Sequence, residues 1–328
     1  MSSFRPEKIG LYASGGDAPG MNAAIRAVVR SASAHQIPVV GIMSGYSGML
    51  SKKFIDLSSR SMGNIIQRGG SILKAGRCPE FNKKEHRKKA VENLRMVGID
   101  SLICIGGDGS FTGALALWNE HKFPCIGIPG TIDNDIYGTD ATVGFDTAVN
   151  TALDAIDKIR DTASSHDRLF IVEVMGRNSG YIALNVGVAG GAEEIFAPEY
   201  PITTDHVVKK IKESHEKGKL SSILVMAEGQ KPGRAYDLAE ALRKKCGLDA
   251  KVCILGHIQR GGSPTANDRI LASYLGHASV EALLNFKQSC MVGMINGKII
   301  QTSFDDAIHK EKKPARDLLD LCEILAMS

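Results

Sequence analysis

The chain has 328 residues, of which 43% are hydrophobic, so it is long enough to fill the cores of two domains. Its 40 basic and 36 acidic side chains nearly cancel, which gives no general reason to expect a nucleic acid or an anionic membrane as a partner. No apolar run approaches the roughly 20 residues of a membrane span, and the opening residues MSSFRPEK lack the apolar core of a signal peptide, so we expect a cytoplasmic protein.

The seven cysteines indicate neither a disulfide framework nor a zinc site. None of them forms a CxxC pair, and Cys104, Cys125 and Cys253 lie inside apolar runs. A thiol in such a run behaves as a small hydrophobic group. We therefore expect free cysteines with a structural role.

Short apolar runs alternate with longer amphipathic stretches along nearly the whole chain. The apolar runs cover residues 8–14, 37–43, 101–107, 124–130, 169–176, 221–229 and 251–257. Helical patterns lie between them, for example over residues 21–35, 147–162 and 205–218. Apolar strands without alternation that are separated by helices indicate parallel sheets covered on both faces. The sequence therefore predicts an α/β protein.

Segments rich in glycine and charge follow most of these runs. They read SGGDAPG, GGDGS, GTIDND, MGRNSG, EG and HIQRGGSP. Because ligands of parallel sheets bind beyond the carboxyl ends of the strands, we expect the chemistry of the protein in these segments. SGGDAPG and MGRNSG both link a strand to a helix, which suggests two similarly built domains.

The first of these segments, SGGDAPG, has features of a phosphate loop. Gly15 and Gly16 would let the backbone approach a ligand, and the amides at a helix start attract phosphate oxygens. Asp17 suits a helix cap and Pro19 an early helical position. Taken alone, the segment is equally consistent with a tight structural turn.

The segment GGDGS repeats this arrangement and adds a carboxylate. Asp108 would hold Mg²⁺ on a nucleotide, while Gly107, Gly109 and Ser110 would face its phosphates. The two loops together favour a nucleotide site over two unrelated turns. Neither loop is a Walker motif, and the chain has no clean GxGxxG fingerprint.

Three aspartates, Asp133, Asp135 and Asp140, follow the apolar run at 124–130. A calcium loop counted from Asp133 fails, because Tyr137 and Gly144 stand where an oxygen ligand and a bidentate glutamate are required. A carboxylate beside a bound triphosphate and Mg²⁺ can instead accept a proton from an attacking hydroxyl. We expect Asp133 to be this base, Asp135 to organise the metal or its waters, and Asp140 to cap a turn. A capped Asx turn is the structural alternative.

Cations near the later strand ends indicate that the acceptor is itself an anion. They are Arg168, Arg177, Lys251, His257 and Arg260. Guanidinium groups suit bidentate contacts with phosphate. The densest basic stretch, KKEHRKK at 83–89, lies instead in a helical pattern, where a solvated helix face is favoured over a binding patch.

PGTIDND, GGDGS, MGRNSG and GHIQRGGSP together resemble the motifs of bacterial ATP-dependent 6-phosphofructokinases, in the order of that family and over essentially the whole chain. The resemblance implies two Rossmann-like three-layer α/β/α domains with mostly parallel sheets and an active-site cleft between them. The larger, ATP-binding domain would combine residues 1–143 with 258–308. The smaller domain, which binds fructose 6-phosphate, would combine residues 144–257 with 309–328. The implied reaction transfers the γ-phosphate of ATP to the 1-hydroxyl of fructose 6-phosphate, with Mg²⁺ as cofactor.

The resemblance also implies roles for individual residues. Asp133 matches the catalytic base, Thr131 lies beside the transferred phosphoryl group, and Arg177 joins them in catalysis. The residues of the ATP site would be Gly16, Arg77, Cys78, Gly107, Asp108, Gly109 and Ser110, with Asp108 toward Mg²⁺. The residues of the sugar-phosphate site would be Thr131, Ile132, Asp133, Arg168, Met175, Gly176, Arg177, Glu228, Lys251, His257 and Arg260. Arg168 reaches in from a neighbouring subunit in the family, which implies a homo-oligomer, usually a tetramer, with shared active sites.

Two departures from the family pattern concern phosphate binding. Lys251 stands where the bacterial pattern has an arginine, and it keeps the charge but loses the bidentate fork. The effector site of the family is matched by Arg26, Arg30, Arg160, Glu193 and Lys217. Basic side chains that are usual in that site are replaced by Ser59, Leu220 and Ser221. We therefore expect ADP or phosphoenolpyruvate to bind there poorly.

Three alternatives share part of the pattern. A pyrophosphate-dependent phosphofructokinase has the same fold, but in that branch an aspartate follows GGD and a lysine precedes TIDND, where this chain has Gly109 and Gly130. NAD kinases and some lipid kinases carry a GGDG loop but lack the other motifs in this order. A non-catalytic sugar-binding protein with two α/β domains would not need an aspartate base beside a nucleotide loop.

Overall fold

The computed structural model describes residues 4–164, 168–218, 221–229 and 231–326. The chain divides into two compact units. Unit 1 comprises Met1–Ile132, Ile136–Asp146 and Arg260–Lys312, and unit 2 comprises Asp133–Asp135, Thr147–Gln259 and Lys313–Ser328. Among the described residues, no helix is both long enough and apolar enough to cross a membrane.

Unit 1 is built on a seven-stranded sheet with the strand order β11-β10-β5-β4-β1-β2-β3. Its strands are β1 (Ile9–Ala13), β2 (Val39–Ile42), β3 (Phe54–Leu57), β4 (Ser101–Gly106), β5 (Cys125–Pro129), β10 (Cys290–Ile295) and β11 (Lys298–Ser303). The five inner strands are parallel, whereas the edge strands β3 and β11 pair antiparallel with their neighbours.

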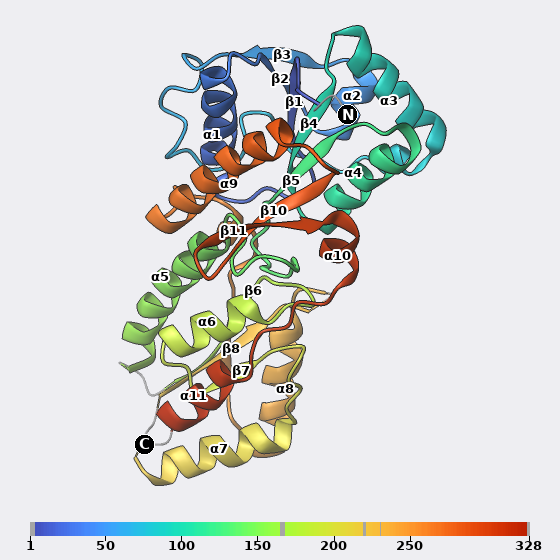
Figure 1. The fold of residues 1–328 in the computed structure, drawn as a ribbon. Helices are drawn as coiled ribbons and strands as arrows, with labels where there is room; N and C mark the ends of the chain where they lie inside the picture. The colour runs from blue at the N-terminus through green and yellow to red at the C-terminus, as the bar shows by residue number, and fades with distance from the viewer. Residues whose placement is uncertain (1–3, 165–167, 219–220, 230, 327–328) are drawn as a thin grey trace. The chain divides into compact units, whose positions relative to one another are not determined.

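Helices cover both faces of this sheet (Figure 1). On one face, α1 (Met21–Ala34) packs against α9 (Ala266–Leu284). On the other face lie α2 (Tyr46–Ser51), α3 (Lys84–Met96), α4 (Asp108–His121) and α10 (Phe304–His309), with the short 3₁₀ helix η1 (Pro79–Asn82) before α3. The result is a three-layer α/β/α arrangement.

Unit 2 contains a four-stranded parallel sheet with the order β7-β8-β6-β9. Its strands are β6 (Leu169–Val174), β7 (Glu194–Phe196), β8 (Ser222–Ala227) and β9 (Ala250–Ile254). On one face α6 (Tyr181–Ala189) packs with α11 (Asp317–Leu325), and on the other α7 (Thr204–Glu216) packs with α8 (Arg234–Cys246). The remaining helices are α5 (Phe145–Ser164) and the 3₁₀ helix η2 (Gly256–Arg260).

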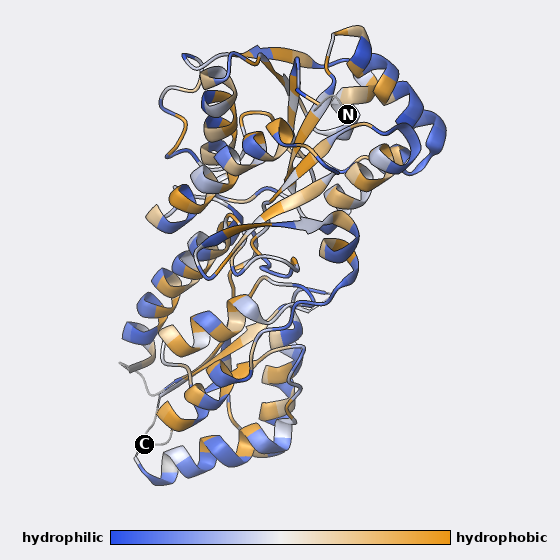
Figure 2. Cartoon of the chain, in the orientation of Figure 1, coloured by the Kyte–Doolittle hydropathy of each residue, from blue (hydrophilic) through white to orange (hydrophobic). Residues whose placement is uncertain are grey.

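The burial of the strands confirms the prediction of an α/β protein with mostly parallel sheets. Every residue of β1, β4, β5 and β8 is buried, as expected for strands that are covered on both faces. Hydrophilic and hydrophobic residues alternate along α5 and α7, whereas the strands are mostly hydrophobic (Figure 2). Helix α7 turns its apolar residues Val207 and Ile211 into the core cluster that contains Ile171 and Leu224 of the sheet.

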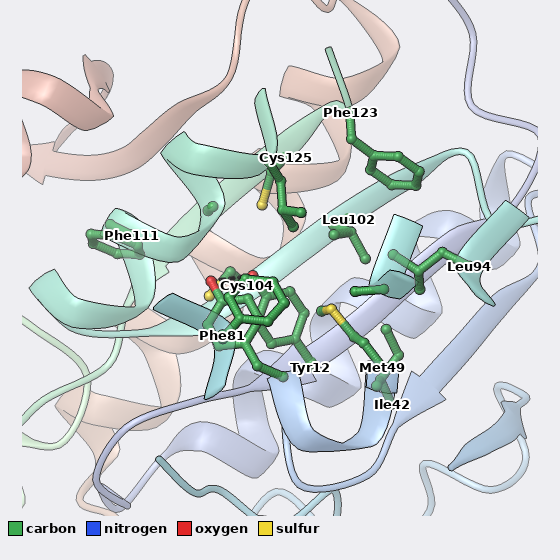
Figure 3. Close-up of a cluster of buried hydrophobic side chains, with 14 of the residues drawn as sticks. Tyr12, Ile42, Met49, Phe81, Leu94, Leu102, Cys104, Phe111, Phe123 and Cys125 are labelled. Atoms are coloured by element: carbon green, nitrogen blue, oxygen red, sulfur yellow. Dashed lines mark hydrogen bonds between the residues drawn. The ribbon is translucent and has the colours of Figure 1, made fainter. Parts of the chain in front are cut away.

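A cluster of buried aromatic and aliphatic side chains fills unit 1 on the face covered by α2, α3 and α4 (Figure 3). The rings of Tyr46 and Phe81 stack with their centroids 4.0 Å apart. The Tyr12 hydroxyl donates to the Tyr46 hydroxyl at 3.0 Å. Burial raises the pKa of both tyrosines, and it raises the pKa of Cys104 to about 12, so these groups remain uncharged. All seven cysteines are free, as expected.

Two local predictions need correction. Helix α1 begins at Met21, and its N-cap is Gly20, with φ of 99° and no side-chain cap. Asp17 and Pro19 therefore lie in the loop, not at the helix start, because a glycine in the left-handed region makes the turn that leads into the helix. The basic stretch at 83–89 is mostly exposed, as predicted, but Arg87 is 8% exposed and forms an ion pair with Glu120.

Candidate active site

The loops that follow β1, β4 and β5 lie side by side in unit 1, because these three strands are neighbours in the sheet. The N–H of Ser14 donates to the carbonyl of Ile105 at 3.0 Å, and the N–H of Gly130 donates to the carbonyl of Gly106 at 3.0 Å. We refer to the SGGD loop (residues 14–17), the GGDGS loop (106–110) and the TIDND segment (131–135). The two glycine loops and the start of the TIDND segment thus share one edge of the sheet, as the carboxyl-end rule predicts.

The SGGD loop is fixed against a second segment that carries predicted ATP contacts. Gly15 has φ of 83°, which favours glycine, and its N–H donates to the carbonyl of Gly76 at 3.3 Å. The next residues are Arg77, whose side chain is exposed, and Cys78, which is half-buried. Both residues therefore adjoin the loop to which the sequence assigned phosphate binding.

Arg260 lies against the SGGD loop. Its Nη1 atom donates to the carbonyl of Asp17 at 3.2 Å, and a Cβ atom on Gly16 would come within 2.8 Å of the same nitrogen. The absence of a side chain at Gly16 thus makes room for the guanidinium group. The assignment of Arg260 to the 6-phosphate of the sugar stays a prediction.

The GGDGS loop carries the start of α4. Gly107 is the N-cap and Asp108 is the first residue of the helix. The helix dipole adds positive potential at this end, which suits phosphate. In the structure the N–H of Gly109 donates to Oδ1 of Asp108 at 2.6 Å, and the N–H groups of Ser110 and Phe111 donate to the carbonyl of Gly107. Asp108 and Gly109 are exposed, and a Cβ atom on Gly109 would meet no atom within 4 Å. Open space therefore lies in front of the helix start.

Ser110 belongs to the same loop but faces inward. Its side chain is 4% exposed, and its Oγ atom has no hydrogen-bond partner among the described residues. Its carbonyl accepts a hydrogen bond of 2.5 Å from the Tyr46 hydroxyl. The buried tyrosine pair thus supports the loop from below, and a contact of the Ser110 hydroxyl with ATP stays a prediction.

The residues present fit a magnesium ion that arrives with a nucleotide. Within the described ranges, no group of three or more histidine, cysteine, aspartate or glutamate side chains could hold a metal by itself. Mg²⁺ needs only one or two carboxylates when substrate phosphates and water complete its shell. The exposed carboxylate of Asp108, at a helix start that suits phosphate, meets this requirement.

The TIDND segment presents its aspartates at different depths. Asp133 is half-buried and Asp135 is exposed, while Asn134 between them is 2% exposed and has φ of 53°. The Oδ1 atom of the Asp133 carboxylate is buried, although the residue as a whole is only half-buried. The role of Asp133 as base stays a prediction. Farther along, the Asp140 carboxylate accepts the N–H of Asn296 at 2.7 Å. This contact confirms the predicted role of Asp140 at a turn.

In unit 2, the loop that follows β6 is held on both sides; we call it the MGRNSG loop (residues 175–180). At its start, the N–H of Met175 donates to Oε1 of the fully buried Gln259 at 2.8 Å. At its end, the N–H of Gly180 donates to both carboxylate oxygens of Glu199, at 2.9 and 3.0 Å. Arg177, between these anchors, is exposed.

Other predicted sugar contacts surround the carboxyl end of the same sheet. Gly176, with φ of 137°, adopts a backbone conformation that only glycine reaches readily. The N–H of Glu228, which follows β8, donates to the carbonyl of Val174 at 2.8 Å. His257 is exposed in η2, just after β9. The sheet thus brings the segments around Met175, Glu228 and His257 together.

Arg168 and Lys251 were expected among the cations at the strand ends where ligands bind, and the structure corrects this. Arg168 directly precedes β6, and Lys251 is the second residue of β9, paired in register with Phe170. Both cations therefore lie at the amino end of the parallel sheet, opposite the MGRNSG loop. The sequence shows the residue types, but not at which end of a strand each one falls.

The predicted effector residues are divided between the two units. Arg26 and Arg30 lie on α1, where Arg26 is half-buried and Arg30 exposed, and Lys217 is exposed after α7. The guanidinium group of Arg160 donates to the carbonyls of Gly190 and Gly191 at the end of α6. Glu193 is 4% exposed and its carboxylate accepts the N–H of Ile223. The effector role of this set stays a prediction.

The three positions that weaken the effector pattern are described only in part. Ser59 and Ser221 are half-buried, and Leu220 lies outside the described residues. Ser59 and Ser221 each carry a short hydroxyl side chain, which has no charge to hold a phosphate.

Three residues that hold the candidate site were not identified from the sequence: Ser179, Gln259 and Glu199. Ser179 and Gln259 lie inside the motifs MGRNSG and GHIQR, so their position in those motifs was a usable signal. Glu199 lies in no motif, and only the fold brings it to Gly180.

The chain matches the sequence model of the family described as Phosphofructokinase over residues 8–283. It is 54% identical to ATP-dependent 6-phosphofructokinase 1 of Thermus thermophilus, over 98% of this chain and 100% of that protein. Among solved structures, phosphofructokinase from Saccharomyces cerevisiae matches with a TM-score of 0.87 and 36% identity, over 98% of this chain and 48% of that longer chain. Pyrophosphate-dependent phosphofructokinase from Marinobacter aquaeolei matches with a TM-score of 0.81 and 25% identity, over 98% and 92%.

Proposed function

Because the chain belongs to the phosphofructokinase family, we propose that it catalyses the ATP-dependent phosphorylation of fructose 6-phosphate. The enzyme transfers the γ-phosphate of MgATP to the 1-hydroxyl of D-fructose 6-phosphate and releases fructose 1,6-bisphosphate and ADP, a step of glycolysis. The observation that carries this proposal is the 54% identity, over 98% of this chain and 100% of the relative, to a protein named for the ATP-dependent activity.

The choice of ATP over pyrophosphate has local support at Gly109. In the pyrophosphate-dependent branch an aspartate occupies this position, where together with a lysine before TIDND it crowds and neutralises the smaller donor. Here the position faces open space at the start of α4, which leaves room for a third phosphate. At Gly130, where that branch has a lysine, a Cβ atom would come within 2.9 Å of Ile105, so a side chain would require a shift in the core.

The chemistry assigned to the chain is a direct phosphoryl transfer. Asp133 accepts the proton of the sugar 1-hydroxyl as the new O–P bond forms and the bond from the γ-phosphorus to the bridging oxygen of ADP breaks. Thr131 and Arg177 stabilise the transferred group and its charge. Mg²⁺, held toward Asp108, neutralises part of the charge on the phosphates when it is bound.

Substrate binding is divided between the two sets of loops. The SGGD and GGDGS loops, with Arg77 and Cys78, bind the nucleotide. The residues that bind the sugar phosphate are Ile132, Met175, Gly176, Arg177, Glu228, His257 and Arg260, completed by Arg168 and Lys251. The chain self-associates, as a homotetramer with shared active sites, and it works in the cytoplasm, where ATP and sugar phosphates are available.

A donor and acceptor screen on the purified protein tests the proposed function. We expect ADP release with ATP, Mg²⁺ and fructose 6-phosphate, and little product when pyrophosphate replaces ATP. Asp133→Asn should lower kcat by roughly 10²- to 10⁴-fold, the usual contribution of a general base, with a modest change in sugar binding. A loss of less than about fivefold would contradict the role of Asp133 as base.

A further inference from the structure

We propose that Ser179 is a positioning residue for Asp133: its side chain ties the residue that carries the base to the loop that carries Arg177. The inference rests on the proposed function, because it gives Asp133 the role of base. The direct observation is a hydrogen bond of 2.7 Å from the Ser179 Oγ atom to the main-chain carbonyl of Asp133.

Ser179 is held firmly enough to transmit this contact. It is 5% exposed, and its N–H donates to the carbonyl of Gly176 at 2.8 Å, which closes the MGRNSG loop on itself. A Cβ atom on Gly176 would lie 2.4 Å from the Ser179 carbonyl, so only glycine allows this tight turn. The position of the Ser179 hydroxyl is therefore set by the same turn that presents Arg177.

The loop is also anchored on the side of α6. Gly180 is the N-cap of this helix, and the Glu199 carboxylate accepts its N–H. A Cβ atom on Gly180 would lie 2.6 Å from Cβ of Ala197, so the loop is packed closely against the segment after β7. An anion at a helix N-terminus is stabilised by the helix dipole. The Ser179 hydroxyl thus projects from a rigid support toward the TIDND segment.

The backbone of the TIDND segment needs such a contact. Asn134, directly after the base, has φ of 53° and is 2% exposed. A non-glycine residue in the left-handed region costs on the order of 1 kcal/mol and persists where the surroundings hold it. Asp133–Asp135 clusters with unit 2, although the residues on both sides of it belong to unit 1. The Ser179 bond is one of the contacts that hold this short segment in unit 2.

Loss of the bond is expected to affect the chemical step more than substrate binding. A displacement of about 1 Å of a reacting group can cost about 10²-fold in rate. Ser179→Ala removes the hydrogen bond to the Asp133 carbonyl and a longer one of 3.5 Å from the N–H of Tyr181, but it does not remove the Asp133 carboxylate itself. Because the base is then less well positioned, we expect kcat to fall about 10-fold. KM for ATP should change by less than about twofold, since no nucleotide residue is altered.

A double-mutant cycle separates positioning from a general structural role. Ser179→Ala is compared in the wild-type protein and in Asp133→Asn, with kcat measured for fructose 6-phosphate and ATP. If Ser179 acts through the base, it should cost less than about twofold once the base is gone. An equal loss in both backgrounds would overturn the proposal.

Two further variants control for folding. Ser222→Ala removes a hydroxyl that is also buried in unit 2, but at the amino end of β8, and it should leave kcat unchanged. Ser179→Cys keeps nearly the same volume with a weak donor, so it should lose activity much as the alanine variant does. Full activity of Ser179→Cys would show that packing, and not the hydrogen bond, matters. A wild-type protein without activity would refute the proposed function instead.

Discussion

At the scale of single residues, Lys251 is where this chain departs from the arginine of its family. Its Nζ atom bonds to Asp249 at 2.7 Å, and this contact lowers the pKa of the aspartate. A lysine has no guanidinium group for bidentate hydrogen bonds, and this one is paired with a carboxylate. We therefore expect it to attract a phosphate only through its single positive charge. Lys251 is thus expected to contribute to binding and not to the chemical step.

We predict that Lys251→Ala raises KM for fructose 6-phosphate about 5- to 30-fold while kcat stays within about twofold. Steady-state kinetics with the sugar phosphate varied at saturating ATP measure both. Lys244→Ala is a matched control, because Lys244 is an exposed lysine with a carboxylate partner, Glu240, at the same distance of 2.7 Å. Unchanged kinetics of the Lys251 variant would remove this residue from the site.

The identities of the site residues were predictable from the sequence to the extent that they lie in motifs. The open position of Gly109 at a helix start and the half-buried Asp133 are consistent with the roles that their motifs suggested. The contacts of Ser179 and Glu199 were not predictable, because a hydrogen bond between residues 46 or 19 positions apart depends on the tertiary fold. The sequence carries the residue type but not the partner.

At the scale of elements, Arg87 joins α3 to α4. Its guanidinium group makes two hydrogen bonds to the Glu120 carboxylate, at 2.8 and 2.7 Å, and a third to the carbonyl of Phe81 at 2.8 Å. The hydrogen bond from Arg87 lowers the pKa of Glu120 in the folded protein. A lowered folded pKa means that the stabilisation is present above the unfolded pKa and is lost as the pH falls through the folded one.

We predict that Glu120→Gln lowers the free energy of unfolding by about 1–3 kcal/mol at pH 7, because it weakens a mostly buried ion pair. The difference from the wild-type protein should shrink as the pH falls below the ordinary glutamate pKa of about 4.5, where the carboxylate of the unfolded chain becomes protonated. It should vanish only below the lowered pKa of the folded protein, where the carboxylate is protonated in both states. Urea unfolding at a series of pH values measures this. Glu240→Gln, which breaks an exposed pair on α8, should have no measurable effect, and a pH-independent difference for Glu120→Gln would refute the electrostatic explanation.

Most of the strands that the sequence predicted are buried along nearly their whole length, and β9 is the exception. All seven apolar runs became strands, whereas β3, β7, β10 and β11 were missed. β3 is a short edge strand whose central residues are exposed, and β7 has three residues, so neither shows a clear pattern. The β10–β11 hairpin had a usable signal, because Asn296-Gly297 turns with positive φ at both residues.

At the scale of the whole molecule, the parallel sheets were predictable because strands and helices alternate along the chain, while the assignment of residue ranges to ATP and sugar domains stays a prediction.

The sheet of unit 2 adds a constraint that bears on assembly. Arg168 and Lys251 lie at the amino ends of β6 and β9, and the MGRNSG loop follows the carboxyl end of β6. A strand of six residues is about 20 Å long, so these cations cannot reach the MGRNSG loop of their own chain.

If both cations contact the sugar phosphate, they must do so in a neighbouring subunit, and mixed oligomers test this. We predict that Asp133→Asn and Arg168→Ala proteins, each impaired at low fructose 6-phosphate, regain activity when they are co-expressed. About a quarter of the sites should then combine an intact Asp133 from one subunit with an intact Arg168 from another, if the subunits mix at random. A mixture of the Asp133→Asn and Arg177→Ala proteins should not regain activity. Asp133 and Arg177 belong to the same unit of one chain, where the Ser179 hydrogen bond links their segments. Every site in that mixture therefore carries one of the two substitutions. Absence of recovery in the first mixture would mean that each subunit builds its site alone.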